Sequence, residues 1–149
     1  MESRRTIVLL LGFSLPVLAV CLPASAAKVF RGPVEAMVVE VLDGDTFLAE
    51  ASVWPGQTVR VNVRIRGIDA PEMKARCNAE RAAALRARDV LASLFGNDPV
   101  AISNIAGAKY YGRVLADVTT SGGDAVASVL LGEKLVRPYA GGRRAGWCG

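Results

Sequence analysis

The sequence predicts a small α+β domain built on a curled antiparallel β-barrel. Its expected elements follow one another as three strands, one helix, two strands and a short helix, with no internal repeat. The length of 149 residues suits a single domain. Of these residues 52% are apolar and 21% are charged, a composition typical of a folded chain with a buried core.

Three strands are expected in the first half of the chain. Residues 34–42 are rich in valine and alternate loosely, and Asp43-Gly44 marks a turn into a second strand at 46–51. A third strand at 58–68 alternates most clearly, which predicts one buried and one polar face. The two faces carry Val59, Val61, Val63 and Ile65 on one side, and Arg60, Asn62, Arg64 and Arg66 on the other.

Residues 78–95 have the clearest helical pattern in the sequence. Gly96 to Pro99 ends the pattern with residues that stop helices. The apolar residues recur at helical spacing and form one stripe, which predicts the face that packs on the barrel. The stripe consists of Ala83, Ala87, Val90, Leu91 and Leu94.

The last third of the chain is expected to add two strands and a short helix. The strands are predicted at 100–105 and 113–119. The helix is predicted to begin after Asp124, which can serve as its N-cap, and to end near Gly132. The tail at 141–149 is rich in glycine and arginine and is expected to be irregular.

The chain contains no histidine, which excludes several classes of site. Ser-His-Asp triads, Cys-His pairs and zinc sites with imidazole ligands are impossible. Three cysteines are also too few for a four-cysteine zinc or iron–sulfur site. Charge is expected to change little between about pH 5 and 8, where no unperturbed side chain titrates. The net charge of +4 permits a polyanionic partner without requiring one.

Residues 1–26 are expected to be a cleaved secretory signal peptide. Arg4 and Arg5 precede an apolar run at 7–22, and Ala24-Ser25-Ala26 has the small residues of a cleavage site. The alternative is an uncleaved membrane anchor, for which the run is shorter than the roughly 20 residues required. The remaining chain, 27–149, would then be secreted or periplasmic, with no stable membrane association.

Two cysteines remain after this cleavage, Cys77 and Cys148. In an oxidising compartment an even pair favours an intramolecular disulfide, which would tie the C-terminus to the middle of the chain. Two free thiols or a bridge between chains are the alternatives.

Charged side chains gather where the expected strands end. Asp43 and Asp45 flank a glycine, and Asp69 and Glu72 follow the strand that carries Arg64. Carboxylate oxygens are ligands for Ca²⁺ or Mg²⁺, Glu72 could act as a general base on water, and arginines can hold a phosphate through two hydrogen bonds.

Each of these residues also has an ordinary structural explanation. The Asp-Gly-Asp segment could be a solvated turn, and Arg64 could lie on an exposed sheet face. Glu72 could cap the following helix or pair with Lys74. A solvated basic face is the expected location of Arg137, Arg143 and Arg144.

Three ordered segments together carry a family resemblance. They are Val-Leu-Asp-Gly-Asp-Thr at 41–46, Arg-Ile-Arg-Gly-Ile-Asp-Ala-Pro-Glu at 64–72 and Lys-Tyr-Tyr-Gly-Arg-Val-Leu-Ala at 109–116. These segments resemble the signature blocks of the staphylococcal-nuclease-like (thermonuclease) family, over about residues 34–139. The resemblance implies a five-stranded OB-type barrel with packed helices in the 27–149 domain.

The resemblance also implies an activity, the Ca²⁺-dependent cleavage of phosphodiester bonds in DNA and RNA, with single-stranded or unpaired substrate preferred. It assigns the residue roles as follows. Arg64, Glu72 and Arg113 would be catalytic, Asp45, Asp69 and the Ala70 carbonyl would bind Ca²⁺, Asp43 would support the metal site, and Tyr111 and Tyr139 would lie near the nucleotide.

Two other classes of function are kept as alternatives. An OB-type barrel with a basic face can bind single-stranded nucleic acid without cutting it. The domain could also be a module that binds another protein. A monomer is expected in each case.

Overall fold

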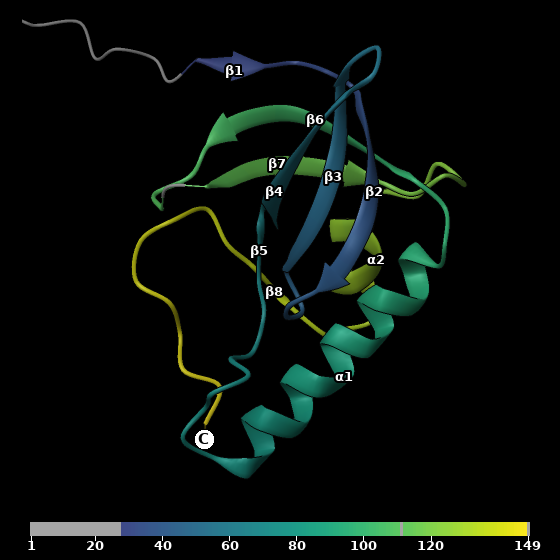
Figure 1. Cartoon of the computed structure of the whole chain (residues 1–149). Coiled ribbons are helices and arrows are strands. Elements are labelled where there is room, and N and C mark those ends of the chain that lie inside the picture. Colours follow the sequence, from purple (N-terminus) through teal and green to yellow (C-terminus); the bar gives the residue numbers. More distant parts are fainter. Residues whose placement is uncertain (1–27, 111, 149) are drawn as a thin grey trace, which may run out of the picture.

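The computed structural model describes residues 28–110 and 112–148. The predicted signal peptide and Tyr111 lie outside these residues. The described chain forms a closed five-stranded β-barrel with two helices, and α1 runs across one end of the barrel (Figure 1). The predicted α+β class and OB-type barrel are confirmed. Neither helix of the described part has the length and apolar character that a membrane crossing needs.

The barrel strands follow the order β6-β2-β3-β4-β7, and β6 pairs with β7 to close the ring. Their bounds are β2 Val34–Val41, β3 Thr46–Trp54, β4 Gln57–Ile65, β6 Val100–Gly107 and β7 Arg113–Thr119. A short strand β1, Val29–Phe30, pairs with Ile105 and Ala106 of β6, beyond the part of β6 that pairs with β2. All neighbours are antiparallel except β4 and β7, which are parallel. The predicted all-antiparallel pairing is therefore wrong at this seam, because an odd number of strands cannot alternate in direction all the way around a closed ring.

The predicted third strand, 58–68, is divided in two. β4 ends at Ile65, the chain turns at Gly67 with a φ of 82°, and β5, Ile68–Asp69, pairs with β8, Arg137–Pro138. The turn is fixed by backbone hydrogen bonds, since the Arg66 amide donates to the Ala116 carbonyl at 2.9 Å. This break directs β5 away from the barrel wall and towards the C-terminal segment.

Helix α1, Asn78–Phe95, has the predicted bounds and packs on the barrel core. Its most deeply buried face is Ala84, Ala87, Leu91 and Phe95, whereas the predicted Ala83 is only half-buried. The Phe95 ring meets the Phe47 ring edge-on, with 4.7 Å between centroids. Ala87 and Leu91 of the predicted stripe are fully buried, and Val90 and Leu94 are partly buried against the core. The buried face differs from the predicted one by including Ala84 and Phe95.

Helix α2, Val126–Gly132, covers the barrel through Val126 and Leu130, both fully buried. Its N-cap is Ala125 and not the predicted Asp124. The Asp124 amide instead donates to the Thr120 hydroxyl at 3.1 Å, which closes the loop before the helix.

A disulfide joins Cys77 to Cys148, with 6.0 Å between their α-carbons, so the predicted intramolecular pairing is confirmed. Cys77 is the N-cap residue of α1. The segment 139–148, here called the C-terminal strap, leaves β8, loops outwards and returns to the beginning of α1 (Figure 1). It contains no regular element, as predicted for the tail.

Candidate functional site

The candidate site lies at the barrel end where β3 begins and β4 ends. Thr46 at the start of β3 is the register partner of Arg64 near the end of β4. The Asp43-Gly44-Asp45 turn leads into Thr46, and β5 brings Asp69 to the same end. Two turns and a strand end therefore gather the carboxylates and an arginine that the sequence motifs single out.

Gly44 allows this turn to pack closely on helix α1. A β-carbon at position 44 would lie 2.7 Å from the β-carbon of Ala87 and 2.9 Å from that of Ala70. No larger residue fits there without a shift of the backbone. The close approach places Asp45 directly beside the Ala70 backbone.

Asp45 is buried, with 3% of the residue exposed, and both of its carboxylate oxygens have partners. Oδ2 accepts a hydrogen bond from the Ala70 amide at 2.8 Å, and Oδ1 accepts one from the Thr46 hydroxyl at 2.8 Å. Oδ1 also forms an ion pair with Arg64. This carboxylate is consequently held in one orientation by groups on three sides.

Arg64 links the two buried carboxylates of the site. Its guanidinium pairs with Asp45, and its Nη2 lies 3.7 Å from Asp69 Oδ1. Nη2 also donates to the Ile68 carbonyl at 3.0 Å. Only 13% of the side chain is exposed, so the strand's polar face at this end is a packed ion-pair network and not a solvated surface.

Asp69 has the oxygen best suited to a cation. Its Oδ1 is buried and accepts no hydrogen bond of good geometry from any described residue, although two arginines lie near it. A buried carboxylate oxygen is costly unless positive charge compensates it, and in this structure Arg64 and Arg144 supply that charge. Together with the fixed carboxylate of Asp45, this donor set fits a hard divalent cation such as Ca²⁺.

The pKa of Asp43 is unusual for an aspartate. Burial, followed by the negative charge of Asp45, raises the pKa of Asp43 from 3.8 to about 6. The Asp45 amide donates to its Oδ1 at 2.9 Å, which opposes that rise. Asp43 is thus a perturbed group that titrates between about pH 5 and 8, where no unperturbed side chain does, because its surroundings disfavour the ionised form.

Glu72 lies at the solvent edge of the site, with 57% of its side chain exposed. Its backbone amide donates to Oε1 of the buried Glu80 at 3.1 Å, which fixes the chain after Pro71. Its carboxylate pairs with Arg144. An exposed carboxylate beside two buried ones can reach a water molecule from solvent.

Arg144 on the C-terminal strap is the residue that sequence reasoning missed. The basic tail was predicted to be a solvated face, yet this guanidinium contacts three carboxylates of the site. Its Nε lies 2.5 Å from Asp69 Oδ1, its Nη2 lies 3.9 Å from Asp45 Oδ2, and its Nη1 pairs with Glu72.

Arg137 is half-buried, and its guanidinium stacks over the Trp147 ring at 3.8 Å. Arg143 is exposed, as predicted. The basic tail thus contains residues with three different environments, which its composition alone does not distinguish.

Arg113 and Tyr139 form no ion pair or hydrogen bond with these carboxylates in the described structure. Arg113 opens β7 opposite Asn62 of β4, and its guanidinium lies 5.5 Å from the centre of the Tyr110 ring. It forms no ion pair with any carboxylate in the described part of the chain. Tyr139 and Arg64 both line a cavity of about 460 Å³ beside the turn at Gly67. Arg113 and Tyr139 could contact a ligand that extends beyond the carboxylates.

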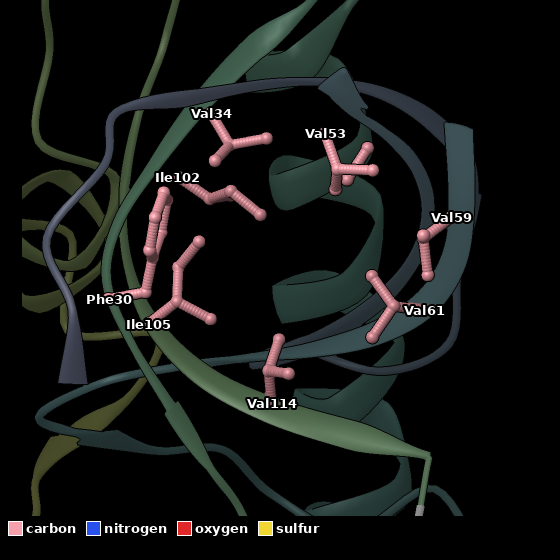
Figure 2. Close-up of a pocket in the computed structure, with 9 residues that line it drawn as sticks. Phe30, Val34, Val53, Val59, Val61, Ile102, Ile105 and Val114 are labelled. Atoms are coloured by element: carbon pink, nitrogen blue, oxygen red, sulfur yellow. The ribbon is translucent and has the colours of Figure 1, made fainter. Parts of the chain in front are cut away.

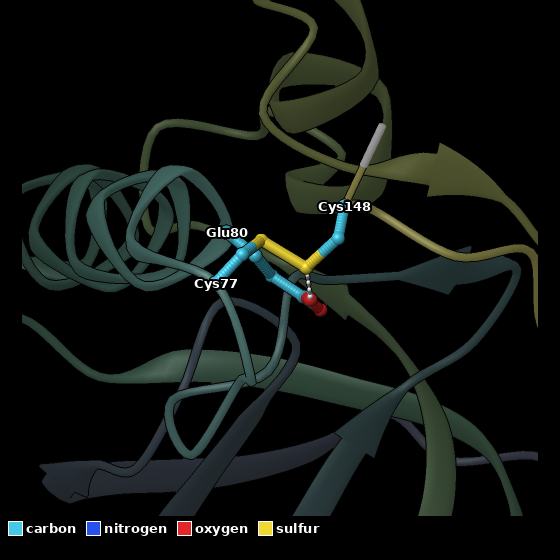
Figure 3. Close-up of side chains that lie close together, drawn as sticks. All are labelled: Cys77, Glu80 and Cys148. Atoms are coloured by element: carbon cyan, nitrogen blue, oxygen red, sulfur yellow. Dashed lines mark hydrogen bonds between the residues drawn. A yellow bond between two sulfur atoms is a disulfide. The ribbon is translucent and has the colours of Figure 1, made fainter.

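Two further features of the molecule do not form part of this site. Cys77, Glu80 and Cys148 lie close together, as Figure 3 shows, but both sulfur atoms belong to the disulfide and are not thiolate ligands. Glu80 Oε2 lies 3.2 Å from the Cys148 sulfur, which carries no hydrogen to donate.

The second feature outside the site is an apolar cavity of about 330 Å³, which lies at the end of the β3–β4 hairpin away from the carboxylates (Figure 2). Its described lining is entirely apolar and includes Phe30, Val53 and Ile105. It offers no group for acid–base or metal chemistry.

Neither the known protein-family models nor the curated proteins include a match to this chain.

Proposed function

We propose that this protein is a Ca²⁺-dependent nuclease that hydrolyses phosphodiester bonds of DNA and RNA. The observation that carries the proposal is the convergence of Asp45, Asp69 and Glu72 with Arg64 at one barrel end. The first two of the three segments that resemble the staphylococcal-nuclease-like family contain these same residues, and the third contains Arg113. Carboxylates beside an arginine are unfavourable for a protein that only binds phosphate, because without a cation they repel the ligand.

In this proposal Asp45, Asp69 and the Ala70 carbonyl hold the ion, and Asp43 supports them. When bound, Ca²⁺ supplies positive charge that offsets the carboxylates and the negative charge that grows on the phosphate. Arg64 is the proposed donor to the non-bridging phosphate oxygens. Arg113, one strand away on the same outward face, is the second phosphate contact.

Glu72 is the proposed general base. Its exposed carboxylate accepts a proton as water attacks phosphorus, the phosphorus–oxygen bond to the leaving nucleotide breaks, and the leaving oxygen takes up a proton from solvent. The chain contains no histidine to do this. Tyr139, which lines the cavity next to Arg64, and Tyr111 are the proposed nucleotide contacts.

The test is digestion of single-stranded DNA by the oxidised protein, with Ca²⁺ and with a chelator. We expect cleavage that the chelator abolishes. Glu72→Gln should lower kcat by about 10²–10⁴-fold, the contribution of a general base. Glu35→Gln is the matched control, because Glu35 is an exposed glutamate on β2 and should leave kcat unchanged.

Two outcomes would contradict the proposal. One is the absence of chelator-sensitive cleavage by folded, oxidised protein. The other is a Glu72→Gln variant as active as Glu35→Gln. Salt-dependent binding of nucleic acid without cleavage, indifferent to Ca²⁺ and to Glu72, would instead favour the binding module.

We also propose that the chain is exported to the periplasm or the medium with removal of residues 1–26. The Cys77–Cys148 disulfide supports this, because such bonds persist in oxidising compartments. The mass of the protein recovered from the periplasm and the medium of an expressing bacterium should correspond to residues 27–149.

A further inference from the structure

We infer that Arg144 is a built-in counter-ion of the carboxylate site, which a divalent cation must displace in order to bind. The C-terminal strap holds this arginine in place and thereby sets the cation affinity of the site. The inference rests on the proposed Ca²⁺ site and adds a residue and a segment that the family resemblance does not assign.

The contacts of Arg144 are those that a cation would make. Its guanidinium lies among Asp45, Asp69 and Glu72, and it is the nearest positive group to the buried Asp69 Oδ1 that accepts no good hydrogen bond. The Asp45 and Asp69 side chains are 4% and 6% exposed, whereas Arg144 is 42% exposed. The arginine therefore covers the buried carboxylates from the solvent side.

Arg144 differs in this respect from Arg64. Arg64 is 13% exposed and is also tied to the Ile68 carbonyl within the barrel end. Apart from its carboxylate partners, Arg144 makes no side-chain hydrogen bond with a described residue. Partial burial alone would lower the pKa of Arg144, but the negative charges of Asp69, Glu72 and Asp45 raise it above its ordinary value. The guanidinium thus stays charged and is held there by those carboxylates.

The strap is anchored on both sides of Arg144. Before it, the Tyr139 amide donates to the Gly67 carbonyl and the Tyr139 hydroxyl donates to the Gly142 carbonyl, each at 2.8 Å. After it, Arg137 donates to the Gly146 carbonyl at 2.8 Å, and the disulfide fixes Cys148 at the start of α1. Figure 3 shows this covalent anchor beside Glu80. Tethering at both ends keeps the guanidinium at a high effective concentration near the carboxylates.

Competition follows from charge and space. A guanidinium and a divalent cation cannot use the same carboxylate oxygens at once, and their like charges repel. Binding of the cation is then coupled to release of Arg144. Because the coupling is reciprocal, weakening the contact of Arg144 with the carboxylates should increase the affinity of the site for the cation.

The experiment is a calorimetric titration of Ca²⁺ into the oxidised protein and its variants. Arg144→Gln should bind Ca²⁺ about tenfold more tightly than wild type, within the usual range of such couplings. Arg143→Gln is the matched control, since it removes the same charge from an adjacent exposed residue and should change the Kd less than twofold.

An equal or lower Ca²⁺ affinity in Arg144→Gln would overturn the inference. If wild type binds Ca²⁺ and cleaves DNA while Arg144→Gln shows no gain, the inference alone fails and the proposed function stands. If neither protein binds Ca²⁺, the inference and the proposed function both fail. Tight binding by Arg144→Gln together with undetectable binding by wild type would support the inference, since the counter-ion is then the barrier.

The strap provides an independent second arm. Cys77→Ser/Cys148→Ser should also raise the Ca²⁺ affinity, because it releases the end of the strap. In the Arg144→Gln background the same pair of changes should add little. An equal gain in both backgrounds would contradict a role for the strap in holding Arg144. If the serine pair fails to fold, as its near-ultraviolet circular dichroism would show, the Arg144→Gln titration decides alone.

Discussion

Asp43 lies two residues before the buried Asp45, and this neighbour contributes to its charge state. Burial and Asp45 raise the pKa of Asp43 to about 6 in the folded protein, against an ordinary value of 3.8. The folded state therefore binds the Asp43 proton more tightly than the unfolded state does. The stabilising contribution is fully present below about pH 3.8 and is lost as the pH rises through about 6.

This leads to a prediction for the metal-free protein. In chelator, the free energy of unfolding of wild type relative to Asp43→Asn should fall as the pH rises from 4 to 7, because only wild type must ionise a half-buried carboxyl. Urea unfolding at four pH values measures the difference. A difference that does not change with pH, or that rises, would contradict the assignment of this titration to Asp43.

At the scale of elements, the contact between the Asp43–Asp45 turn and α1 determines where the carboxylates lie. Gly44 faces Ala87 of α1 and Ala70, and all three are small. The β-carbons of the two alanines cannot rotate away, so an added methyl group at position 44 must move the turn or the helix.

Gly44→Ala should therefore destabilise the protein by about 1–3 kcal/mol, the usual cost of overpacking. It should also weaken Ca²⁺ binding, because Asp45 moves with the turn. Gly107→Ala is the matched control, since nothing lies within 4 Å of its added β-carbon and its φ is ordinary. Equal unfolding free energies for the two variants would show that the turn does not need the close approach.

At the scale of the whole molecule, sequence patterns predicted the structural features that are determined by residues close together in the chain. The bounds of α1 and β7 match the expected 78–95 and 113–119, because each follows from periodicity and local stop signals. The motif segments also predicted which carboxylates would gather, since all of them lie between Asp43 and Glu72, on the turns and strands of one barrel end.

The features that the sequence did not predict depend on contacts between segments that lie far apart in the chain. The parallel β4–β7 seam follows from closing five strands into a ring. Arg144 is 72 residues from Glu72, and no periodicity connects the two. A signal was present, however, because the Cys77–Cys148 pairing brings the tail to the start of α1, five residues after Glu72 in the sequence.

The proposed cation site is assembled from segments far apart in the sequence, so we expect it to exist only in the folded protein. An ion that binds only the folded protein stabilises it by mass action, by about 2.7 kcal/mol at one hundred times its Kd. For a domain of this size we expect Ca²⁺ at that concentration to raise Tm by roughly 10 °C over chelator. Scanning calorimetry measures the shift.

Asp69→Asn is the discriminating variant, because it removes charge from the buried carboxylate that lacks a good hydrogen bond on Oδ1. Its own Tm will differ from that of wild type, since it leaves Arg64 and Arg144 with one carboxylate fewer. The comparison is therefore the Ca²⁺-induced shift within each protein. That shift should largely vanish in Asp69→Asn, and an unchanged shift would mean that Ca²⁺ binds elsewhere on the molecule.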